Sequence, residues 1–367
     1  MTIRAAILRD TSLSMPIETI TVEEPRADEV LVRVVATGIC HTDIKMALVP
    51  GLVPRPIVLG HEGAGIVEKV GSAVRKVAPG DHVVMTFDSC GQCPTCDRGM
   101  PAYCYEVRPR TFGGARMDGS TPLRCEGVET LHGKYFGQSS FATQALSYER
   151  NVVKVRKDAP LELLGPLGCG IQTGAGAVLN SLKVTAGSKF AVFGTGAVGL
   201  SAVMAARVAG ASVIIACEVN EKRRAMAAEL GATHVLDPAA EDVSARIREI
   251  TGDGVDFALD TSAVTAVIQQ AISALRPLGT CGVLANKGPT QEVPVPVLPL
   301  MLGGRTLRGL VQGDSVPDLF IPMLIDLFMA GRFPIDKLVT FYPFEEIDRA
   351  LADNDSGAAI KPVVRMG

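Results

Sequence analysis

The fold is decided by the stretch Lys189-Phe190-Ala191-Val192-Phe193-Gly194-Thr195-Gly196-Ala197-Val198-Gly199, which leads into the apolar segment 198–208. A short buried strand is followed by glycines in the pattern G-x-G-x-x-G. Gly194 permits a tight turn, Gly196 lets the backbone approach a pyrophosphate, and Gly199 lets a helix pack on the strand. Free N–H groups at the start of that helix favour phosphate. We therefore predict a dinucleotide-binding loop that includes Ala197 and Val198; the alternative is a tight turn that binds nothing.

An acidic residue ends the next predicted strand, 212–217. This residue is Glu218, nineteen positions after Gly199. A carboxylate at this place accepts a hydrogen bond from a ribose 2′-hydroxyl and repels a 2′-phosphate, so NAD is predicted in preference to NADP. Arg223, counted among the predicted cofactor contacts, and Arg224 follow closely and could weaken that preference.

Strands and helices alternate on both sides of the glycine-rich loop, between about residues 166 and 300. Predicted strands include 189–193, 234–236, 256–259 and 280–284, and predicted helices include 221–230, 243–250 and 264–275. This alternation is typical of βαβ units and a doubly wound parallel sheet, which makes the fold class α/β.

Residues 1–165 instead hold short strand-like runs separated by Gly, Pro and Asp, among them 29–35, 140–145 and 152–155. We expect residues 301–367 to complete this β-rich domain.

Composition excludes several classes of function. Hydrophobic residues make up 47% of the chain and charged residues 20%, as in globular proteins with a core. The net charge is −3 and Trp is absent, so nucleic acid and anionic membranes have no electrostatic or stacking support. The N-terminus carries only a four-residue apolar stretch, residues 5–8, which is too short for a signal peptide. A cytoplasmic protein with reduced thiols is expected.

Four of the nine cysteines lie within fifteen residues, as Cys90-x2-Cys93-x2-Cys96-x7-Cys104. Four thiolates close a tetrahedral zinc site and leave no position for substrate, so the spacing predicts a structural zinc. An iron–sulfur cluster favours a shorter last gap followed by Pro, whereas Cys104 precedes Tyr105. Disulfides are the other alternative, and they are disfavoured in a reducing compartment.

Further metal-type ligands are dispersed along the chain. They occur in Cys40-His41-Thr42-Asp43, in Gly60-His61-Glu62-Gly63 and in Gly168-Cys169-Gly170. Any one of these residues alone is more often a packing residue than a ligand. Together they offer two thiolates and one imidazole, the three-ligand set of a catalytic zinc with one open position; the standard example of this set is alcohol dehydrogenase.

In these motifs, taken in order and spacing, the sequence resembles the zinc-dependent medium-chain alcohol dehydrogenases over essentially its whole length. It is most similar to the aryl-alcohol branch, with relatives that act on allylic terpenoid alcohols. The similarity to that branch is carried by Phe136-Gly137-Gln138-Ser139-Ser140-Phe141 and by the run from Leu161 to Gly210. The resemblance implies a Rossmann domain inserted into a β-rich, GroES-like catalytic domain, and a homodimer or homotetramer.

The resemblance also implies roles for individual residues. Cys40, His61 and Cys169 would bind the catalytic zinc, with Glu62 behind the metal. Asp43 would fix the His61 tautomer, and Thr42 would accept the alcohol proton. The family's cofactor contacts correspond to His41 and Lys361 near the pyrophosphate and to Thr173 beside the nicotinamide. The four clustered cysteines would hold a second, structural zinc.

The activity implied is transfer of a hydride from aromatic or allylic primary alcohols to NAD, and the reverse. Phe87, Phe136 and Leu300 are candidates for an apolar pocket. Lys45 stands where many relatives carry a His that ends the proton relay, and a protonated ammonium cannot accept a proton. We hypothesise that the relay ends at the cofactor ribose and solvent.

Two alternatives to this function are a dehydrogenase acting on a formaldehyde–glutathione adduct and a non-catalytic nucleotide- or zinc-binding protein. The apolar stretch 293–310 is expected to form an edge strand and loop at a subunit interface.

Overall fold

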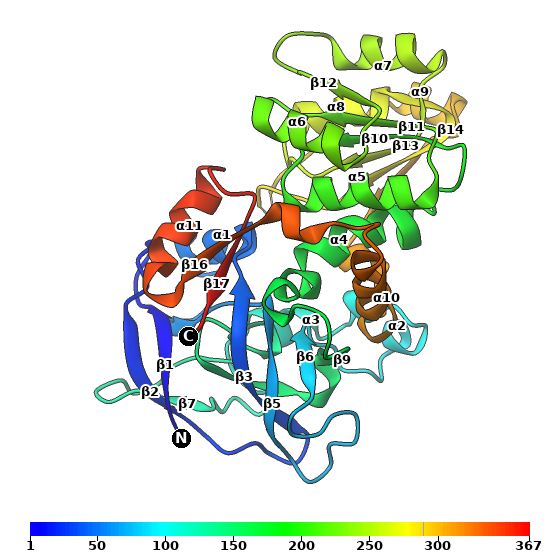
Figure 1. Ribbon diagram of the computed structural model, residues 1–367. Helices are drawn as coiled ribbons and strands as arrows, with labels where there is room; N and C mark the ends of the chain where they lie inside the picture. The colour runs from blue at the N-terminus through cyan, green and yellow to red at the C-terminus, as the bar shows by residue number, and fades with distance from the viewer. Residues whose placement is uncertain (289) are drawn as a thin grey trace. The chain divides into compact units, whose positions relative to one another are not determined.

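The computed structural model describes residues 1–288 and 290–367 and divides the chain into two compact units (Figure 1). The first unit comprises Met1–Gly170, Val316–Met329 and Ile335–Gly367, and the second comprises Ile171–Ser315 and Ala330–Pro334. Both ends of the chain therefore build one unit, and the other is inserted between them. Pro289, which falls in the predicted nucleotide domain, lies outside the described residues.

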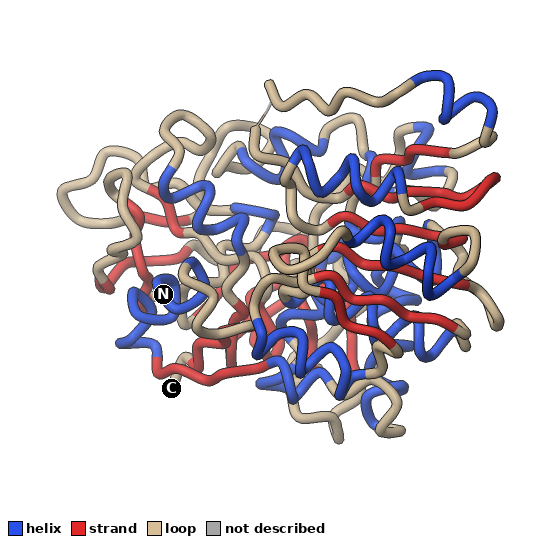
Figure 2. The backbone as a smooth tube through the Cα atoms, turned by 90° about the horizontal axis from the view of Figure 1, so that it is seen from above, coloured by secondary structure: helices blue, strands red, loops and turns tan. Residues whose placement is uncertain are grey.

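The second unit is built on a six-stranded parallel sheet in the order β12-β11-β10-β13-β14-β15. The strands are β10 (Lys189–Phe193), β11 (Val213–Cys217), β12 (His234–Leu236), β13 (Val255–Asp260), β14 (Leu275–Val283) and β15 (Thr306–Gly309). The chain passes between them through α5 (Ala197–Ala209), α6 (Glu221–Leu230), α7 (Val243–Thr251), α8 (Thr265–Ser273) and α9 (Val297–Leu302). Figure 2 shows the strands of this unit bordered by helices. This is the predicted doubly wound arrangement.

Local sequence explains where these helices begin and end. The side chain of Asn220 accepts a hydrogen bond from the Arg223 amide at 3.2 Å, which starts α6. Gly210, at φ +80°, ends α5 in the left-handed conformation that glycine adopts readily. The apolar faces of the helices cover the sheet in a core that includes Phe193, Ile215 and Ile247. The carboxyl end of β10 is thereby fixed beside the glycine-rich turn.

The first unit contains two largely antiparallel sheets. A seven-stranded sheet runs in the order β16-β17-β3-β5-β6-β9, with β8 also pairing with β3, and a four-stranded sheet runs in the order β4-β1-β2-β7. The strands are β1 (Thr2–Leu8), β2 (Ile17–Val22), β3 (Glu29–Gly38), β4 (Ile57–Val58), β5 (Gly63–Val70), β6 (His82–Met85), β7 (Leu123–Arg124), β8 (Gln144–Tyr148), β9 (Val152–Val155), β16 (Val339–Pro343) and β17 (Lys361–Arg365). β17 pairs with β3, so the end of the chain completes the β-rich unit as expected.

Several helices lie in the segments that connect the strands of the first unit. They are α1 (His41–Leu48), α2 (Pro94–Asp97), α3 (Val107–Phe112), α10 (Pro317–Met329) and α11 (Ile347–Asp355), and α4 (Gly170–Gly176) begins at its boundary with the second unit. α1 follows β3 directly, and α2 lies inside the four-cysteine segment. Both helices therefore start at residues with predicted metal-ligand chemistry.

The boundaries of the units differ from those expected from the sequence. The second unit extends to Ser315 rather than to residue 300, because β15 pairs with β14 and adds the sixth strand to the parallel sheet. It begins at Ile171 rather than at residue 166, so Cys169 belongs to the β-rich unit. Within the stretch 293–310 the structure has an edge strand, as expected, but also the helix α9.

Some predicted elements have other bounds in the structure. The strand expected at residues 140–145 is observed as β8 at Gln144–Tyr148, because the amides of Ser140 and Phe141 donate instead to the carbonyls of Gly60 and Leu59. These bonds draw residues 140–141 into a loop beside the Gly60 turn. The helix expected over 264–275 ends at Ser273, because Leu275 begins β14.

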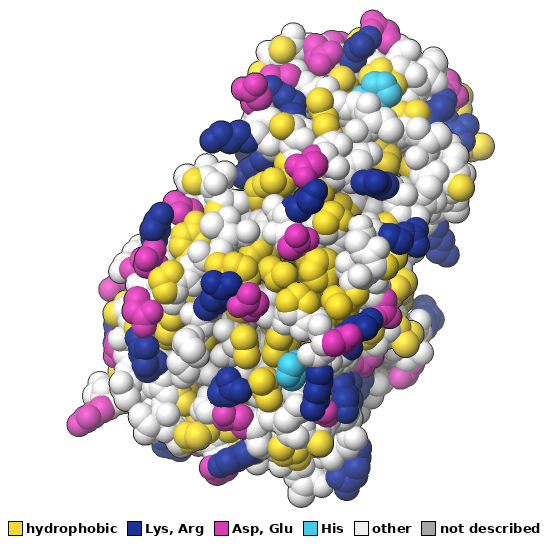
Figure 3. Space-filling view, in the orientation of Figure 1, with side chains coloured by type: hydrophobic (Ala, Val, Ile, Leu, Met, Phe, Trp, Pro, Cys, Tyr) yellow, Lys and Arg dark blue, Asp and Glu magenta, His cyan; other side chains and the backbone are white. Residues whose placement is uncertain are grey.

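One drawn face of the surface carries charges of both signs, and the helices among the described residues include no candidate membrane span. On the face drawn in Figure 3, Lys and Arg side chains lie among Asp and Glu side chains. Across residues 1–288 and 290–367, every helix is too short or too polar to span a bilayer.

Candidate active site

Three distant segments of the first unit bring four ligand-type side chains together. Cys40 lies at the junction of β3 and α1, His61 and Glu62 lie in the turn before β5, and Cys169 directly precedes α4. One ligand atom of each lies within 4.8 Å of the others. Three of these residues are buried, and Cys40 is half-buried. The structure therefore assembles the dispersed ligands that the sequence singled out.

The start of α1 positions Cys40. Cys40 is the N-cap residue of this helix, with extended backbone (φ −122°, ψ 150°), and its sulfur accepts from the Thr42 amide at 3.5 Å. The Cys40 amide donates to Oδ2 of Asp43 at 3.1 Å, which closes a reciprocal cap. A hydrogen bond from Cys169 and the charge of His61 hold the pKa of Cys40 well below its ordinary value. The thiolate form, which is the metal-binding form, is thus favoured.

Asp43 also orients the imidazole. Its Oδ1 lies 2.9 Å from Nδ1 of His61, and both side chains are fully buried. Although burial lowers it, the charge and hydrogen bond of Asp43 raise the pKa of His61 to about 10. With Nδ1–H donating to Asp43, loss of the other ring proton would leave Nε2 as the nitrogen able to bind a metal.

The His61 ring is clamped on its other faces by aromatic side chains. Phe136 stacks on it with ring centroids 4.3 Å apart and planes inclined by 21°, and Tyr135 meets it edge-on at 5.6 Å. Nε2 of His61 is buried without a hydrogen-bond partner among the described residues. A buried ring nitrogen without a partner, beside two cysteine sulfurs and a carboxylate, fits a zinc ion, since each of these groups is of a type that zinc prefers.

Glu62 is paired with a residue from the far end of the chain. Nζ of Lys361 donates to both carboxylate oxygens, at 3.1 and 3.0 Å, and to the Ile39 carbonyl at 2.9 Å. The Gly170 amide also donates to Glu62, at 3.1 Å. Burial raises the pKa of Glu62 to about 7 despite the opposing charge of Lys361. All three ammonium hydrogens of Lys361 have acceptors, so the pyrophosphate contact implied by the resemblance would require one of them to be exchanged.

The remaining predicted residues of α1 lie around Cys40. The Thr42 hydroxyl is 3.6 Å from the Cys40 sulfur, which places a small hydroxyl beside the ligand cluster. His41 is exposed on the first turn, and Lys45 is half-buried one turn further along. Thr42 is therefore the hydroxyl of this helix nearest the cluster that can both accept and donate a proton.

The four clustered cysteines form a second ligand group. The sulfurs of Cys90, Cys93, Cys96 and Cys104 lie within 4.8 Å of one another. Cys93 is the N-cap residue of α2, and the amides of Cys90 and Glu106 donate to the Cys104 sulfur at 3.2 and 3.4 Å. Burial raises the pKa of Cys104 to about 12, and these amide donors oppose that effect because they stabilise a thiolate. Four such sulfurs complete a tetrahedron and fit a closed zinc site.

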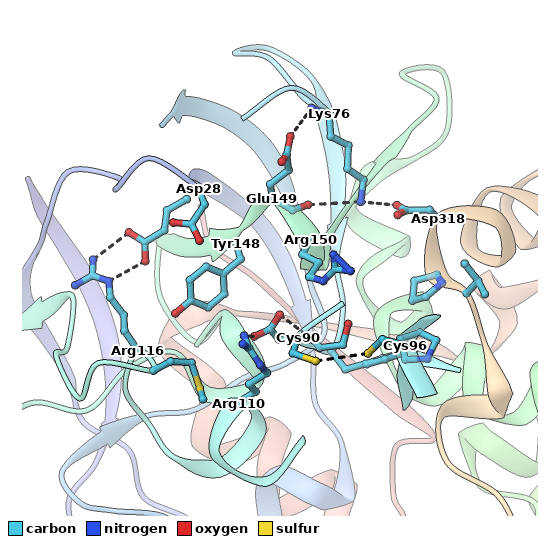
Figure 4. Close-up of a pocket in the computed structure, with 18 of the residues that line it drawn as sticks. Asp28, Lys76, Cys90, Cys96, Arg110, Arg116, Tyr148, Glu149, Arg150 and Asp318 are labelled. Carbon is cyan, nitrogen blue, oxygen red and sulfur yellow. Dashed lines mark hydrogen bonds and ion pairs between the residues drawn. The ribbon is translucent and has the colours of Figure 1, made fainter. Parts of the chain in front are cut away.

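A cavity of about 950 Å³ lies beside this second group, not beside His61 (Figure 4). Charged side chains that pair with one another line much of it, including Lys76 with Asp318 and Arg110 with Asp88. The predicted pocket residue Phe87 lines this cavity, whereas Leu300 belongs to α9 of the second unit. This cavity is therefore not assigned as the active site, because Cys40, His61 and Cys169 do not line it.

The three glycines of the loop in the second unit meet different steric demands. Gly194 has φ +90°, and a Cβ there would lie 2.7 Å from the Thr261 hydroxyl. A Cβ on Gly199 would collide with the Gly194 carbonyl, so this glycine allows α5 to approach the turn. A Cβ on Gly196 would meet nothing within 4 Å, which leaves open space where a ligand can approach the backbone.

Other predicted cofactor contacts lie in the same unit. Glu218 follows β11 and is buried, and Arg223 is half-buried on α6. Arg224 donates to the Glu218 and Val219 carbonyls and pairs with Asp237, which turns its charge away from the Glu218 carboxylate. The Thr173 hydroxyl donates to Oε1 of Gln312 at 3.3 Å.

Sequence reasoning missed two supports of the first cluster. Tyr135 contacts His61 through its ring, and Nε2 of Gln138 donates to the His61 carbonyl at 3.0 Å. Both lie in or next to the segment 136–141 that carried the resemblance. The sequence of that segment indicated the family resemblance. It did not indicate the left-handed backbone of Phe136 (φ 51°), which places the ring of this residue on His61.

Comparisons with known proteins identify the family of the chain. Residues 26–157 match the family model described as alcohol dehydrogenase GroES-like domain, and residues 197–328 match the one described as zinc-binding dehydrogenase. The chain is 48% identical to a geraniol dehydrogenase of Castellaniella defragrans, over 98% of this chain and 97% of that protein.

Two solved structures share the whole fold. An alcohol dehydrogenase zinc-binding domain protein from Burkholderia ambifaria has 53% identity and a TM-score of 0.99, and the match covers 100% of this chain and 99% of that one. The benzyl alcohol dehydrogenase of Acinetobacter calcoaceticus has 46% identity and a TM-score of 0.97, with both chains fully covered. The chain therefore belongs to the zinc-dependent alcohol dehydrogenase family of oxidoreductases.

Proposed function

We propose that this enzyme oxidises aromatic or allylic primary alcohols to aldehydes with NAD, and catalyses the reverse reduction. The observation that carries the proposal is the unpartnered Nε2 of His61, buried beside Cys40 and Cys169 from distant segments. The two relatives named above as acting on geraniol and benzyl alcohol support the substrate class.

Cys40, His61 and Cys169 would hold a catalytic zinc, with Glu62 as a further ligand when the bound group exchanges. A zinc there would supply a Lewis acid that favours the deprotonated form of a coordinated hydroxyl. Thr42 would take up the alcohol proton, since its hydroxyl donates and accepts at once. We propose that the proton leaves by the cofactor ribose and solvent rather than through the ammonium of Lys45.

NAD would occupy the glycine-rich loop of the second unit and would supply the hydride acceptor. The open space at Gly196 and the acid at Glu218 support this choice. Contacts by Gly194, Ala197, Val198 and Gly199 with the pyrophosphate belong to the same proposal. The cofactor contacts implied for His41, Thr173, Arg223 and Lys361 stay predictions.

The four clustered cysteines would hold a structural zinc, which makes two zinc ions per subunit. With four sulfurs converging on one point, no ligand position remains for substrate. The cysteines of both groups require reduced thiols, so we place the enzyme in the cytoplasm.

We also propose a homodimer or homotetramer. Leu278, Val297, Met301 and Leu302 are exposed apolar side chains of β14 and α9, near the edge strand β15 of the parallel sheet. An exposed apolar edge of this kind is normally covered by another chain.

Initial rates with benzyl alcohol, cinnamyl alcohol, geraniol and ethanol, each with NAD and with NADP, test the function. Higher kcat/KM for the conjugated alcohols with NAD is expected. Zinc-loaded protein that reduces no dinucleotide with any alcohol would instead identify a non-catalytic relative. A clear preference for S-(hydroxymethyl)glutathione would move the chain to the formaldehyde-oxidising class.

A further inference from the structure

The carboxylate of Glu218 is tied directly to the glycine-rich loop. Its Oε2 accepts from the Thr195 amide at 2.8 Å and from the Thr195 hydroxyl at 3.0 Å. Thr195 has no exposed surface and Glu218 is 6% exposed. Thr195 is the residue between Gly194 and Gly196, so the acid after β11 and the turn after β10 form one hydrogen-bonded assembly.

The other carboxylate oxygen is only half used. Oε1 of Glu218 accepts from the Asn220 amide at 3.0 Å. A carboxylate offers about four acceptor positions, two on each oxygen. Thr195 fills both positions of Oε2 and Asn220 fills one of Oε1, so one acceptor position remains among the described contacts. The segment after β11 is itself held, because Nη1 of Arg224 donates to the Glu218 carbonyl at 2.8 Å.

We propose that Thr195 is the positioning residue that sets the dinucleotide preference, and this rests on the proposed use of NAD. By holding Oε2, Thr195 prevents the carboxylate from rotating and directs the one free position of Oε1 to a single ribose hydroxyl. The same restraint keeps a negative charge where a 2′-phosphate would have to bind. The preference for NAD thus depends on the fixed negative charge of Glu218 and on one hydrogen bond from a ribose hydroxyl to Oε1. It does not depend on a bidentate contact of both carboxylate oxygens with the ribose.

Thr195→Val isolates this restraint. The substitution keeps the volume and the backbone N–H but removes the hydroxyl donor, so the carboxylate gains freedom to turn. A hydrogen bond to a charged group is strong enough that its loss should narrow the ratio of NADPH to NADH dissociation constants by roughly three- to tenfold. The KM for NAD should rise while kcat changes little, because the reacting atoms are not touched. Thr195→Ser retains the hydroxyl and should restore the wild-type ratio.

Thr261→Val is the matched control. The Thr261 hydroxyl donates to the carbonyls of Phe193 and Gly194, at 3.1 and 3.0 Å, so it braces the same turn without touching Glu218. If Thr195 merely stabilised the loop, both valine variants would weaken the binding of both dinucleotides equally. We expect Thr261→Val to leave the NADPH-to-NADH ratio at its wild-type value.

The experiment is fluorescence titration of zinc-loaded protein with NADH and with NADPH, followed by initial rates with benzyl alcohol and both oxidised cofactors. A narrowed ratio in Thr195→Val, restored in Thr195→Ser and absent in Thr261→Val, supports the proposal. An unchanged ratio in Thr195→Val, or an equal narrowing in Thr261→Val, overturns it while leaving the proposed function intact. Wild-type protein that binds neither dinucleotide overturns the proposed function and this inference together.

Discussion

Asp43 connects two of the predicted zinc ligands through one carboxylate. Its Oδ1 lies 2.9 Å from Nδ1 of His61, and its Oδ2 accepts from the Cys40 amide at 3.1 Å. Oδ1 also accepts from the Gly60 amide at 3.3 Å, so the turn that carries His61 is held to the start of α1. One buried side chain therefore fixes both the orientation of the imidazole and the position of the first cysteine.

Asp43→Asn should lower zinc affinity at this cluster by about 10- to 100-fold, the usual effect of losing a carboxylate that orients a metal-bound histidine. The amide keeps the shape but not the charge that favours the Nδ1–H tautomer. Competition with a chromophoric chelator measures the change. Asp348→Asn is the control, since Asp348 accepts from Ser14 and Met15 in another part of the unit. Equal zinc affinity in both variants would refute the orienting role.

The parts of the molecule that could be predicted are those encoded by neighbouring residues. The bounds of β9, β10, β12 and α6 agree with the predictions, because periodicity and capping residues act within one segment. The family, the fold class and the enzyme class predicted from motifs are confirmed by the comparisons. The spacing of the four cysteines also sufficed to predict that their sulfurs would converge.

Contacts between residues far apart in the chain could not be predicted from the sequence. Lys361 and Glu62 are 299 positions apart, and nothing local indicates that a buried lysine on β17 will meet that carboxylate. The stacking of Phe136 on His61 depends on a left-handed backbone, and the bonds from Thr195 to Glu218 depend on the spacing of two parallel strands. Each of these required the tertiary structure.

Removal of one thiol from the four-cysteine group should cost one zinc per subunit. Cys93→Ser leaves three sulfurs, and the segment that they order has little apolar core of its own, so the thermal midpoint should fall and the segment 90–106 should become sensitive to protease. Zinc measured per chain should drop from two to about one. Cys125→Ser, which alters a thiol outside both groups, should keep both ions. Two zinc ions retained in Cys93→Ser would contradict the assignment.

Acid should destabilise the first unit through Glu29. This fully buried carboxylate accepts from Arg116 at 2.8 and 3.0 Å and pairs with Lys134 at 3.1 Å. Although burial raises it, these partners lower the pKa of Glu29 from 4.5 to about 2. A depressed carboxyl pKa stabilises the folded state above about pH 4.5, and that stability is lost as pH falls toward 2.

Glu29→Gln should remove this acid dependence and cost about 3–5 kcal/mol at pH 7, because it leaves buried Lys134 without its carboxylate and Arg116 with Glu23 alone. Thermal midpoints between pH 7 and pH 3 measure both effects, and any zinc lost in acid affects both proteins alike. Glu24→Gln, which breaks only the exposed pair with Lys69, is the control. If the midpoints of wild type and Glu29→Gln fell in parallel, the titration of Glu29 would not be the cause.

The exposed apolar side chains around α9 give the last prediction. Met301 is 65% exposed and Leu302 is 75% exposed on α9, the helix that precedes the edge strand β15 in the chain. Burial of such side chains against a second copy stabilises association through the hydrophobic effect. Wild-type protein should therefore be a dimer or tetramer by size-exclusion chromatography with light scattering, and Met301→Asp should shift it toward smaller species, since a buried unpaired charge opposes association. Leu319→Asp alters an equally exposed apolar residue on α10 and should leave the oligomer unchanged. A monomeric wild type, or equal dissociation by both variants, would show that α9 does not form the interface.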